Sequence, residues 1–255
     1  MFTHAIVRTP AATLTEGIST ANLGKPIYPL ALEQHAAYIR ALRACGVAVT
    51  VMEPDPAYPD SCFVEDAAVL AERVAVITNP GAESRKGEER AVEEVLRRFY
   101  ASDQIQHIHA PGTLEGGDIM RVGECFYVGL SERTNPEGAR QFREILREYG
   151  YTVREVQLNE MLHLKTGLAY LENGILLTAG EFAGHPLFRD FKTIPIDPLD
   201  AYSANCIWVN GTVLVPAGYP ATTARIEAAG LTVLEVDTSE FRKLDGGLSC
   251  LSLRF

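Results

Sequence analysis

Short β-branched and apolar runs alternate along this chain with segments of helical spacing. Residues 4–10 (HAIVRTP) predict a strand. Residues 30–46 place apolar side chains near helical spacing and end in Gly46, the residue type that most easily forms a left-handed helix cap. Residues 47–54 (VAVTVMEP) predict a second strand. The chain therefore begins as strand, amphipathic helix and strand.

A hairpin pattern then recurs, in which two apolar strands flank a tight turn. Its copies lie at residues 63–100, 113–158, 163–180 and 204–218. Asn-Gly pairs at 173–174 and 210–211 mark two of the turns, and Asn-Gly is the strongest short hairpin signal. The first two copies continue into a helix, and the last is followed by a predicted helix at 221–230 and a strand at 231–237.

The N-terminal strand and helix form an incomplete unit that lacks a hairpin partner. Residues 250–255 (CLSLRF) predict a single strand that would fill this gap. Repeats of roughly 45 to 50 residues that combine a hairpin with a crossover helix are typical of radial repetition, which protects sheet edges. We therefore expect an α/β ring like a propeller, closed by pairing of the N- and C-terminal segments. An ordinary open α/β sheet is the competing arrangement.

Composition limits the classes of protein to consider. The chain has 255 residues, is 47% hydrophobic and contains no linker or low-complexity segment, so we expect one domain over residues 1–255. The first ten residues are too short and polar for a signal peptide, and no apolar run approaches the roughly 18 residues of a membrane span. A soluble, cytoplasmic protein without a membrane partner is expected. The net charge of −10 disfavours nucleic acid and suits a cationic small molecule.

The cysteines are odd in number and none forms a CxxC pair. They are Cys45, Cys62, Cys125, Cys206 and Cys250. Such spacing argues against a disulfide framework and against a zinc site, so free thiols and no metal are expected. Gly246 and Gly247 lead into Cys250 and would let a ligand or another backbone come close to its thiol.

The residues at which the strands open are the candidates for chemistry. They are Glu65 and Asp66, Glu115 to Asp118, His163 with Lys165, Ala204 with Asn205, and Cys250. A ring would bring these matching places together, and a thiol nucleophile needs a histidine to move protons and an anion to orient that histidine. By itself Cys250 could be a small buried side chain and His163 a structural histidine. Their places in the repeat favour the catalytic interpretation.

Acidic residues gather just before and within the first hairpin. Asp55, Asp60, Glu65 and Asp66 occupy one short span, and the last two interrupt an apolar run. A carboxylate in a buried strand needs a partner. A guanidinium stays protonated, because its pKa lies above ~12, and it presents a fork of N–H donors that matches carboxylates. The acids are therefore suited to hold a guanidinium in front of a thiol.

Several motifs together resemble one enzyme family. FVED, GAESRKGE, EGGD, SERTNPEGAR, HLKTGLAY, ANCIWVN, PAGYP and DGGLSCLSLRF, spread over essentially the whole chain, are similar to segments of the dimethylarginine dimethylaminohydrolases. These enzymes belong to the guanidine-modifying (amidinotransferase, or pentein) superfamily. The resemblance implies a five-bladed α/β propeller of pseudosymmetric ββαβ units. It also implies hydrolysis of Nω-methylated arginine to citrulline and an alkylamine, without a cofactor.

The resemblance also implies roles for individual residues. Cys250 takes the nucleophile position, His163 that of the general acid and base, and Glu115 that of the carboxylate that partners the histidine. Around the guanidinium it places Asp60 and Asp66, with Glu65 on the same segment. For the substrate carboxylate it indicates Arg85 and Arg133, and for the substrate amine the backbone carbonyls of Ile18 and Leu244.

Other functions remain open at this point. An arginine deiminase or amidinotransferase of the same superfamily would share the thiol, histidine and acids, although deiminases resemble this chain plus a helical insertion that is absent here. A non-enzymatic arginine-binding protein is a further alternative, and a homodimer is possible. Where the deiminases that this chain resembles carry a second aspartate, two residues after the histidine, this chain has Lys165. The loss of that acceptor predicts a preference for methylated over plain arginine.

Overall fold

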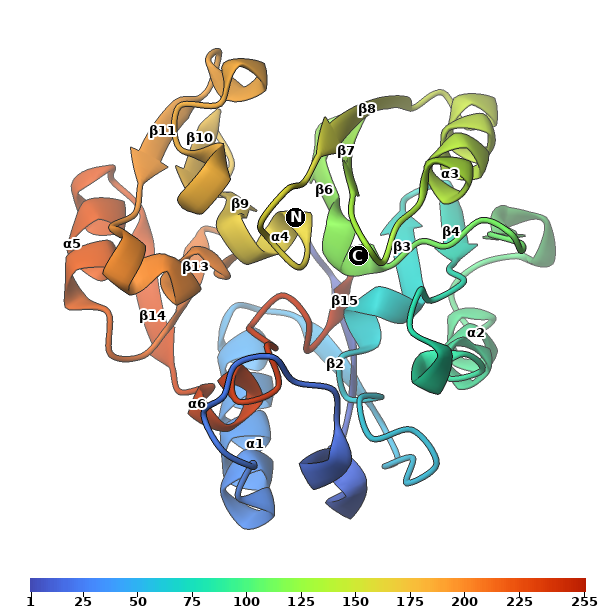
Figure 1. Ribbon diagram of the computed structural model, residues 1–255, viewed down its shortest axis with the longest axis horizontal. Coiled ribbons are helices and arrows are strands. Elements are labelled where there is room, and N and C mark those ends of the chain that lie inside the picture. Colours follow the sequence, from blue (N-terminus) through green and yellow to red (C-terminus); the bar gives the residue numbers. More distant parts are fainter.

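The computed structural model describes residues 1–255, and its strands form five separate three-stranded sheets arranged around the middle of the molecule (Figure 1). The sheet that joins the two ends of the chain contains β1 (His4–Arg8), β2 (Ala48–Met52) and β15 (Leu253–Arg254). The others contain β3 (Ala68–Ala71), β4 (Val74–Ile77) and β5 (Ile105–His107); β6 (Ile119–Val122), β7 (Cys125–Leu130) and β8 (Thr152–Gln157); β9 (Leu168–Tyr170), β10 (Ile175–Thr178) and β11 (Lys192–Pro195); and β12 (Ile207–Val209), β13 (Thr212–Pro216) and β14 (Thr232–Val236).

All five sheets share one pairing pattern. The middle strand, which is β1, β4, β7, β10 or β13, pairs antiparallel with one neighbour and parallel with the other. In the first sheet the antiparallel neighbour is β15, with Ala5 opposite Arg254, so the expected pairing of the two chain ends is confirmed. Both termini accordingly lie near the middle of the view in Figure 1. The open single sheet that competed with the ring is wrong.

The longer helices lie outside the sheets (Figure 1). They are α1 (Tyr28–Ala44), α2 (Glu89–Leu96), α3 (Pro136–Glu148) and α5 (Pro220–Ala228). Helix α3 begins where the sequence favours it, because Asn135 accepts the Gly138 N–H at 2.8 Å and Pro136 fills the first turn. Between β10 and β11 the crossover contains only the 3₁₀ turns η6 (Gly180–Phe182) and η7 (Pro186–Phe188). A short helix, α6 (Ser239–Arg242), precedes the C-terminal turn.

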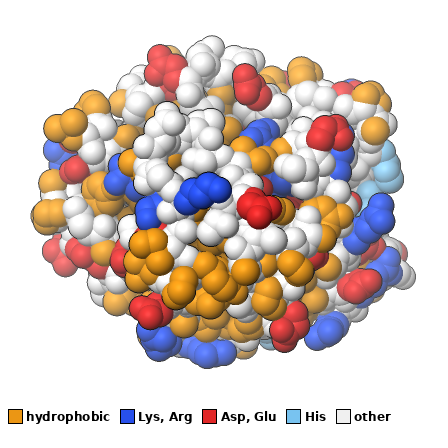
Figure 2. All heavy atoms as spheres, turned by 60° about the horizontal axis from the view of Figure 1, so that its bottom comes forward, with side chains coloured by type: hydrophobic (Ala, Val, Ile, Leu, Met, Phe, Trp, Pro, Cys, Tyr) orange, Lys and Arg blue, Asp and Glu red, His pale blue; other side chains and the backbone are white.

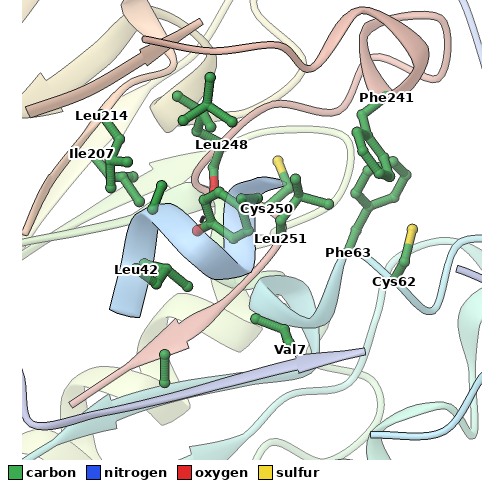
Figure 3. Close-up of a cluster of buried hydrophobic side chains, with 14 of the residues drawn as sticks. Val7, Leu42, Cys62, Phe63, Ile207, Leu214, Phe241, Leu248, Cys250 and Leu251 are labelled. Atoms are coloured by element: carbon green, nitrogen blue, oxygen red, sulfur yellow. Dashed lines mark hydrogen bonds between the residues drawn. The ribbon is translucent and has the colours of Figure 1, made fainter. Parts of the chain in front are cut away.

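The core is divided into several apolar clusters instead of one. The largest joins α1 and the sheet of β12–β14 to the C-terminal turn, and it includes Phe63, Phe241, Leu248 and Cys250 (Figure 3). Phe63 and Phe241 meet edge to face with ring centroids 6.2 Å apart. Cys250 is therefore fixed by packing on one side, and its backbone cannot move independently of this cluster.

The candidate residues were predicted to lie at the first positions of strands, and this placement is wrong. Four of the segments are instead short helical segments that precede a strand: η2 (Val64–Ala67), η5 (Gly116–Asp118), α4 (Leu164–Gly167) and η8 (Pro198–Ala204). Cys250 lies in a turn, and β15 begins only at Leu253. The first N–H groups of a helical turn have no partner within the turn, so they are free to bind side chains.

The surface is mixed in character. The face turned forward in Figure 2 shows hydrophobic side chains gathered in its lower half, between scattered charged ones. Large hydrophobic residues that are exposed include Leu23, Ile27 and Leu199. No helix has the length and apolar character that crossing a membrane requires.

Candidate active site

One pocket brings together nine of the ten residues named from the sequence. They are Ile18, Asp60, Asp66, Arg85, Glu115, Arg133, His163, Leu244 and Cys250. The cavity has a volume of ≈ 50 Å³, and Thr20, Phe63, Leu162, Asp245 and Gly246 complete its lining. These residues come from segments far apart in the chain, and the ring of sheets brings them together (Figure 1).

The turn that carries Cys250 is held by close packing. A Cβ on Gly246 would lie 2.2 Å from the Phe63 ring, and one on Gly247 would lie 2.5 Å from the amide of Asn205. Both glycines are needed because neighbouring side chains approach closely, as the sequence suggested. Asn205 also accepts the Ser249 N–H at 2.9 Å and donates to the Lys165 carbonyl at 3.2 Å. It thereby ties the segment after His163 to the Cys250 turn.

The Cys250 thiol is strongly disfavoured as an anion in this state. Burial, followed by the charges of Glu65 and Asp66, raises the pKa of Cys250 to about 12. The Ser249 hydroxyl lies 3.8 Å from its sulfur and opposes this effect only weakly. All five cysteines are free, as expected.

His163 and Glu115 form a buried dyad. Nε2 of His163 lies 2.8 Å from Oε2 of Glu115, and the other oxygen of Glu115 accepts the Gly81 N–H at 3.0 Å. Burial opposes ionisation of Glu115, but its hydrogen bond to His163 and the charges of His163 and Arg85 lower its pKa. Because Glu115 holds Nε2, the Nδ1 atom of His163 is left to exchange protons in the pocket.

The surroundings of His163 favour its protonated form. Burial would lower its pKa, but the charges of Asp118 and Asp66 and the hydrogen bond with Glu115 outweigh burial and raise the pKa to about 9. Asp118 is fully buried and accepts the Leu164 N–H at 3.0 Å and the Ser131 hydroxyl at 2.7 Å. It holds the segment next to His163, a positioning role that its place among the hairpin-opening candidates did not specify.

Both carboxylate oxygens of Asp66 are anchored in the pocket. Its Oδ1 accepts the Gly117 N–H at 2.8 Å, and its Oδ2 lies 2.6 Å from Nη1 of Arg85. A Cβ on Gly117 would lie 2.8 Å from Nδ1 of His163 and 2.9 Å from Asp66. Glycine at this position therefore lets the acid and the histidine sit close together. The free N–H of the η5 turn provides the fixed partner for the acid.

Asp60 and Arg85 complete this side of the pocket. Asp60 accepts the Ile18 N–H at 3.1 and 3.3 Å, and burial raises its pKa. Arg85 also binds Glu88 and donates to the Phe63 carbonyl at 3.0 Å. Its Nε is buried without a partner, so one donor remains. Glu88 ends the motif GAESRKGE, but it was given no role from the sequence, because its function is to pair with Arg85 and not to line the pocket.

Arg133 is the freer of the two arginines. Its Nη1 lies 3.5 Å from Oε1 of Glu115, and its side chain is 17% exposed. Since this contact is long, the guanidinium can exchange it for an anionic ligand that enters the pocket.

Two segments distant in sequence form the rim that carries Ile18 and Leu244. The Thr20 N–H donates to Asp245 at 2.5 Å, and the Ser19 hydroxyl donates to the Lys243 carbonyl at 2.5 Å. Asp245 adopts a positive φ of 58°. These contacts between loops leave no periodic signal, so the sequence could not have revealed Thr20, whereas Asp245 lies in the motif DGGLSCLSLRF but was given no role of its own.

Glu65 is the one named residue whose side chain does not reach this pocket. Its carboxylate points into a second cavity, where it contacts Lys165 at 2.5 Å and Arg254 at 3.3 Å. Its N–H donates to the Cys250 carbonyl at 3.1 Å, so its backbone helps to hold the nucleophile's turn. Lys165 likewise lies outside the pocket.

One group of side chains could hold a metal ion. Ligand atoms of Asp66, Glu115 and His163 lie within 4.8 Å of one another. Asp66 already binds Arg85 and Gly117, and Glu115 binds His163, so a metal would have to displace these partners. The arrangement fits a hydrogen-bonded dyad beside a guanidinium-binding acid better than a ligand set.

Comparison with known proteins gives a consistent result. Residues 19–183 match the family model described as N,N dimethylarginine dimethylhydrolase, eukaryotic. The chain is 56% identical to an N(G),N(G)-dimethylarginine dimethylaminohydrolase of Pseudomonas aeruginosa, with all of both chains covered. It is 38% identical to one of Streptomyces coelicolor, which covers 98% of this chain and 96% of that protein.

Solved structures agree. A cysteine-to-serine mutant of the Pseudomonas aeruginosa enzyme complexed with citrulline is 55% identical and superimposes with a TM-score of 0.98 over all of both chains. A dimethylarginine dimethylaminohydrolase variant as an adduct with S-methyl-L-thiocitrulline gives the same TM-score. The N-terminal domain of a cyanobacterial arginine dihydrolase covers 98% of this chain and 97% of its own with a TM-score of 0.86, but at 20% identity it shows only a shared fold.

Proposed function

The chain belongs to the dimethylarginine dimethylaminohydrolase family and is a hydrolase of methylated arginine, and we propose that it forms citrulline through a covalent thiouronium on Cys250. The observation that carries the assignment of roles is the convergence of Cys250, the His163–Glu115 dyad and the anchored Asp66 in one buried pocket. A thiol, a proton carrier and a cation-binding acid are the groups that this reaction needs.

The substrate guanidinium is held by the acids. Asp66 is fixed by the Gly117 N–H and Asp60 by the Ile18 N–H, so both present carboxylate oxygens in set directions. They bind the guanidinium N–H groups and fix its central carbon in front of Cys250. At the other end, Arg85 and Arg133 neutralise the substrate carboxylate, and the carbonyls of Ile18 and Leu244 accept hydrogen bonds from the substrate ammonium.

The substrate itself ionises the nucleophile. The pKa of the free thiol is about 12, so Cys250 is protonated in the resting enzyme at neutral pH. A guanidinium ~4 Å away contributes on the order of 4 kcal/mol at an effective dielectric of ~20, enough for about three pKa units before losses. Three units bring the pKa of the Cys250 thiol from about 12 to about 9, so the bound substrate raises the small thiolate fraction at neutral pH about a thousandfold. The thiol proton leaves to solvent.

The reaction then proceeds in two halves. The Cys250 thiolate adds to the guanidinium carbon, and protonated His163 gives its proton to the departing alkylamine nitrogen as the C–N bond breaks. A thiouronium and a neutral imidazole remain. Water adds to the thiouronium carbon and gives one proton to His163. Cleavage of the C–S bond then releases citrulline, and the remaining hydroxyl proton of the adduct passes to the departing sulfur and restores the resting thiol. Glu115 stabilises the imidazolium in both halves.

A direct assay tests the activity. The protein is incubated separately with arginine, monomethylarginine and asymmetric dimethylarginine, and citrulline is measured. Citrulline from both methylated substrates is expected. Equal or faster release from plain arginine would favour an arginine deiminase, and no release from any of the three would favour a binding protein.

Three further features are part of the proposal. The five sheets, with their shared pairing pattern, are read as the blades of a five-bladed α/β propeller. Pairing of β1 with β15 supports one domain over residues 1–255. Homodimerisation and cytoplasmic location stay predictions, to be tested by light scattering after size-exclusion chromatography and by cell fractionation.

A further inference from the structure

Glu88 is a buried acid beside the catalytic pocket. Its side chain is 2% exposed, and it lines neither the pocket nor the second cavity. Its one ion pair is with Nη2 of Arg85, whose Nη1 binds Asp66. Oε2 of Glu88 is buried without a partner. Burying a carboxylate costs free energy, because its charged form loses contact with water, so the contribution of Glu88 should lie in its effect on Arg85.

Hydrogen bonding alone does not explain Glu88. Nη2 of Arg85, the atom that Glu88 binds, also donates to the Phe63 carbonyl at 3.0 Å and to the Asp60 carbonyl at 3.4 Å. Two carbonyls provide acceptors for both hydrogens of this nitrogen. What Glu88 adds is therefore a negative charge, and it adds this charge next to the cation that is bound to Asp66.

Asp66 has two cations beside it before any substrate arrives. Its Oδ2 lies 2.6 Å from Nη1 of Arg85, and its charge helps to raise the pKa of His163. Each cation weakens the attraction that Asp66 can exert on a further positive charge. The charge of His163 is offset by two other acids, Asp118 and Glu115. Arg85 requires an acid of its own if Asp66 is to attract a substrate cation.

Glu88 meets this requirement. Burial opposes the charge of Arg85, but the carboxylates of Glu88, Asp66 and Glu115, in decreasing order of effect, keep its pKa raised. The acid with the largest effect on Arg85 is thus the one that lies outside the pocket. Asp66 and Arg85 together carry no net charge, whereas Asp66, Arg85 and Glu88 together carry one negative charge.

From these observations we propose that Glu88 is a positioning residue that holds Arg85 and offsets its charge, so that Asp66 keeps its attraction for the substrate guanidinium. Glu88 acts through Arg85 and does not touch the substrate. This inference rests on the proposed binding of the guanidinium by Asp66, and it adds the residue that keeps this acid available for a cation.

Two ligands that differ in side-chain charge test this role. Monomethylarginine carries a guanidinium and citrulline a neutral urea, and both have the same amino-acid end. Their dissociation constants are measured by isothermal titration calorimetry in Cys250→Ser protein, which prevents turnover. The buffer is at about pH 8, because burial raises the pKa of Glu88 to about 7 against the opposing charge of Arg85. Effects on binding of the substrate carboxylate cancel in the ratio of the two constants.

The variants are compared by this ratio. Glu88→Gln should weaken binding of monomethylarginine about tenfold relative to citrulline, the effect of a unit charge on the order of 10 Å away at an effective dielectric of ~20. Glu88→Asp keeps the charge and should stay within about threefold of the starting ratio. If Glu88→Gln does not fold, Glu88→Met, which removes the charge together with the unpaired oxygen, takes its place.

Glu83 provides the matched control. It lies in the same motif, GAESRKGE, and pairs with Lys86, but its side chain is 84% exposed. Water and salt screen such a charge, so Glu83→Gln should leave the ratio unchanged.

Three results would overturn the role of Glu88. They are a ratio that stays within about threefold when the charge of Glu88 is removed, an equal change in Glu88→Asp, and an equal change in Glu83→Gln. Asp66→Asn separates this failure from that of the proposed function. If Asp66→Asn weakens monomethylarginine selectively and Glu88→Gln does not, only the role of Glu88 fails. If neither variant is selective, guanidinium binding by Asp66 fails as well.

Discussion

Glu65 and Asp66 are neighbours in one helical turn and are about equally buried, but Asp66 lines the catalytic pocket and Glu65 lines the second cavity. No residue lines both cavities, so a thin wall of protein separates them. Both oxygens of Asp66 are paired, with the Gly117 N–H and with Arg85, beside His163. Glu65 faces Lys165 and Arg254 in the other cavity and leaves one oxygen unpaired. The difference teaches that the partners of a buried carboxylate, more than its residue type or position in the chain, decide what it can do.

The largest effect on turnover should come from replacing a cysteine by serine in the catalytic pocket, compared with the same replacement in the second cavity. Cys250→Ser should lower kcat by about 10³-fold or more, because a serine hydroxyl ionises far less readily, while substrate binding persists. Cys206, a buried thiol that lines the second cavity, is the matched control. Cys206→Ser should change mainly the free energy of unfolding. Near-normal turnover by Cys250→Ser, measured as citrulline release, would refute the mechanism.

The two neighbouring acids give the next largest contrast. Asp66→Asn should lower kcat/KM for asymmetric dimethylarginine by about 100-fold or more, since losing one partner of a buried ion pair costs about 3 kcal/mol. Glu65→Gln should lower it less than about tenfold and act mainly on stability, because its side chain points away from the pocket. Steady-state kinetics with thermal unfolding of both variants checks this. Equal losses of kcat/KM in the two variants would contradict the assignment of Asp66, but not Glu65, to substrate binding.

Substrate choice should follow from the lack of a hydrogen-bond acceptor at position 165. Two residues after His163, where the deiminases that this chain resembles carry an aspartate, this chain has Lys165. Its side chain lies in the second cavity beside Glu65, so this position supplies no acceptor to the catalytic pocket. Plain arginine leaves N–H donors unpaired at roughly 1 to 3 kcal/mol each, and a buried methyl contributes roughly 0.8 kcal/mol. We expect kcat/KM for mono- or asymmetric dimethylarginine to exceed that for arginine by at least about tenfold. A ratio near one in competition assays would contradict this.

The pH profile of kcat/KM should report the ionisation of the catalytic residues. His163 must be protonated to act as general acid, and its pKa is about 9, whereas the Cys250 thiol, with a pKa of about 12, must lose its proton, so kcat/KM should rise with pH and the alkaline limb, where this rise ends, should begin at about pH 9. Because the charge of Asp66 helps to raise the pKa of His163, Asp66→Asn should move the alkaline limb to lower pH. Glu65 is not among the main charges that raise the pKa of His163, so Glu65→Gln should leave the start of the limb in place, although the charge of Glu65 does raise the pKa of Cys250. An alkaline limb that shifts by the same amount in both variants would show that the charge of Glu65 acts on His163 as strongly as that of Asp66.

Much of the fold was readable from the sequence, because hairpins and helices carry periodic signals. The unpaired N-terminal strand and the residues CLSLRF predicted the β1–β15 closure from the count of strands alone. Motifs placed nine residues in the pocket, but the directions of Glu65 and Lys165 were not visible, since one residue of a helical turn decides which cavity a side chain enters. Thr20 went unnoticed, and Asp245 was noted only as part of a motif, because their contact joins two loops through a backbone N–H.

The covalent intermediate offers the most direct test of the central claim that chemistry occurs at Cys250. The enzyme is quenched with acid during turnover of asymmetric dimethylarginine, digested, and its cysteine peptides are analysed by mass spectrometry. We predict a thiouronium adduct on the peptide that contains Cys250, and none on those with Cys62 or Cys206. An adduct on another cysteine, or turnover to citrulline without any adduct on Cys250 under conditions that trap it, would contradict the account.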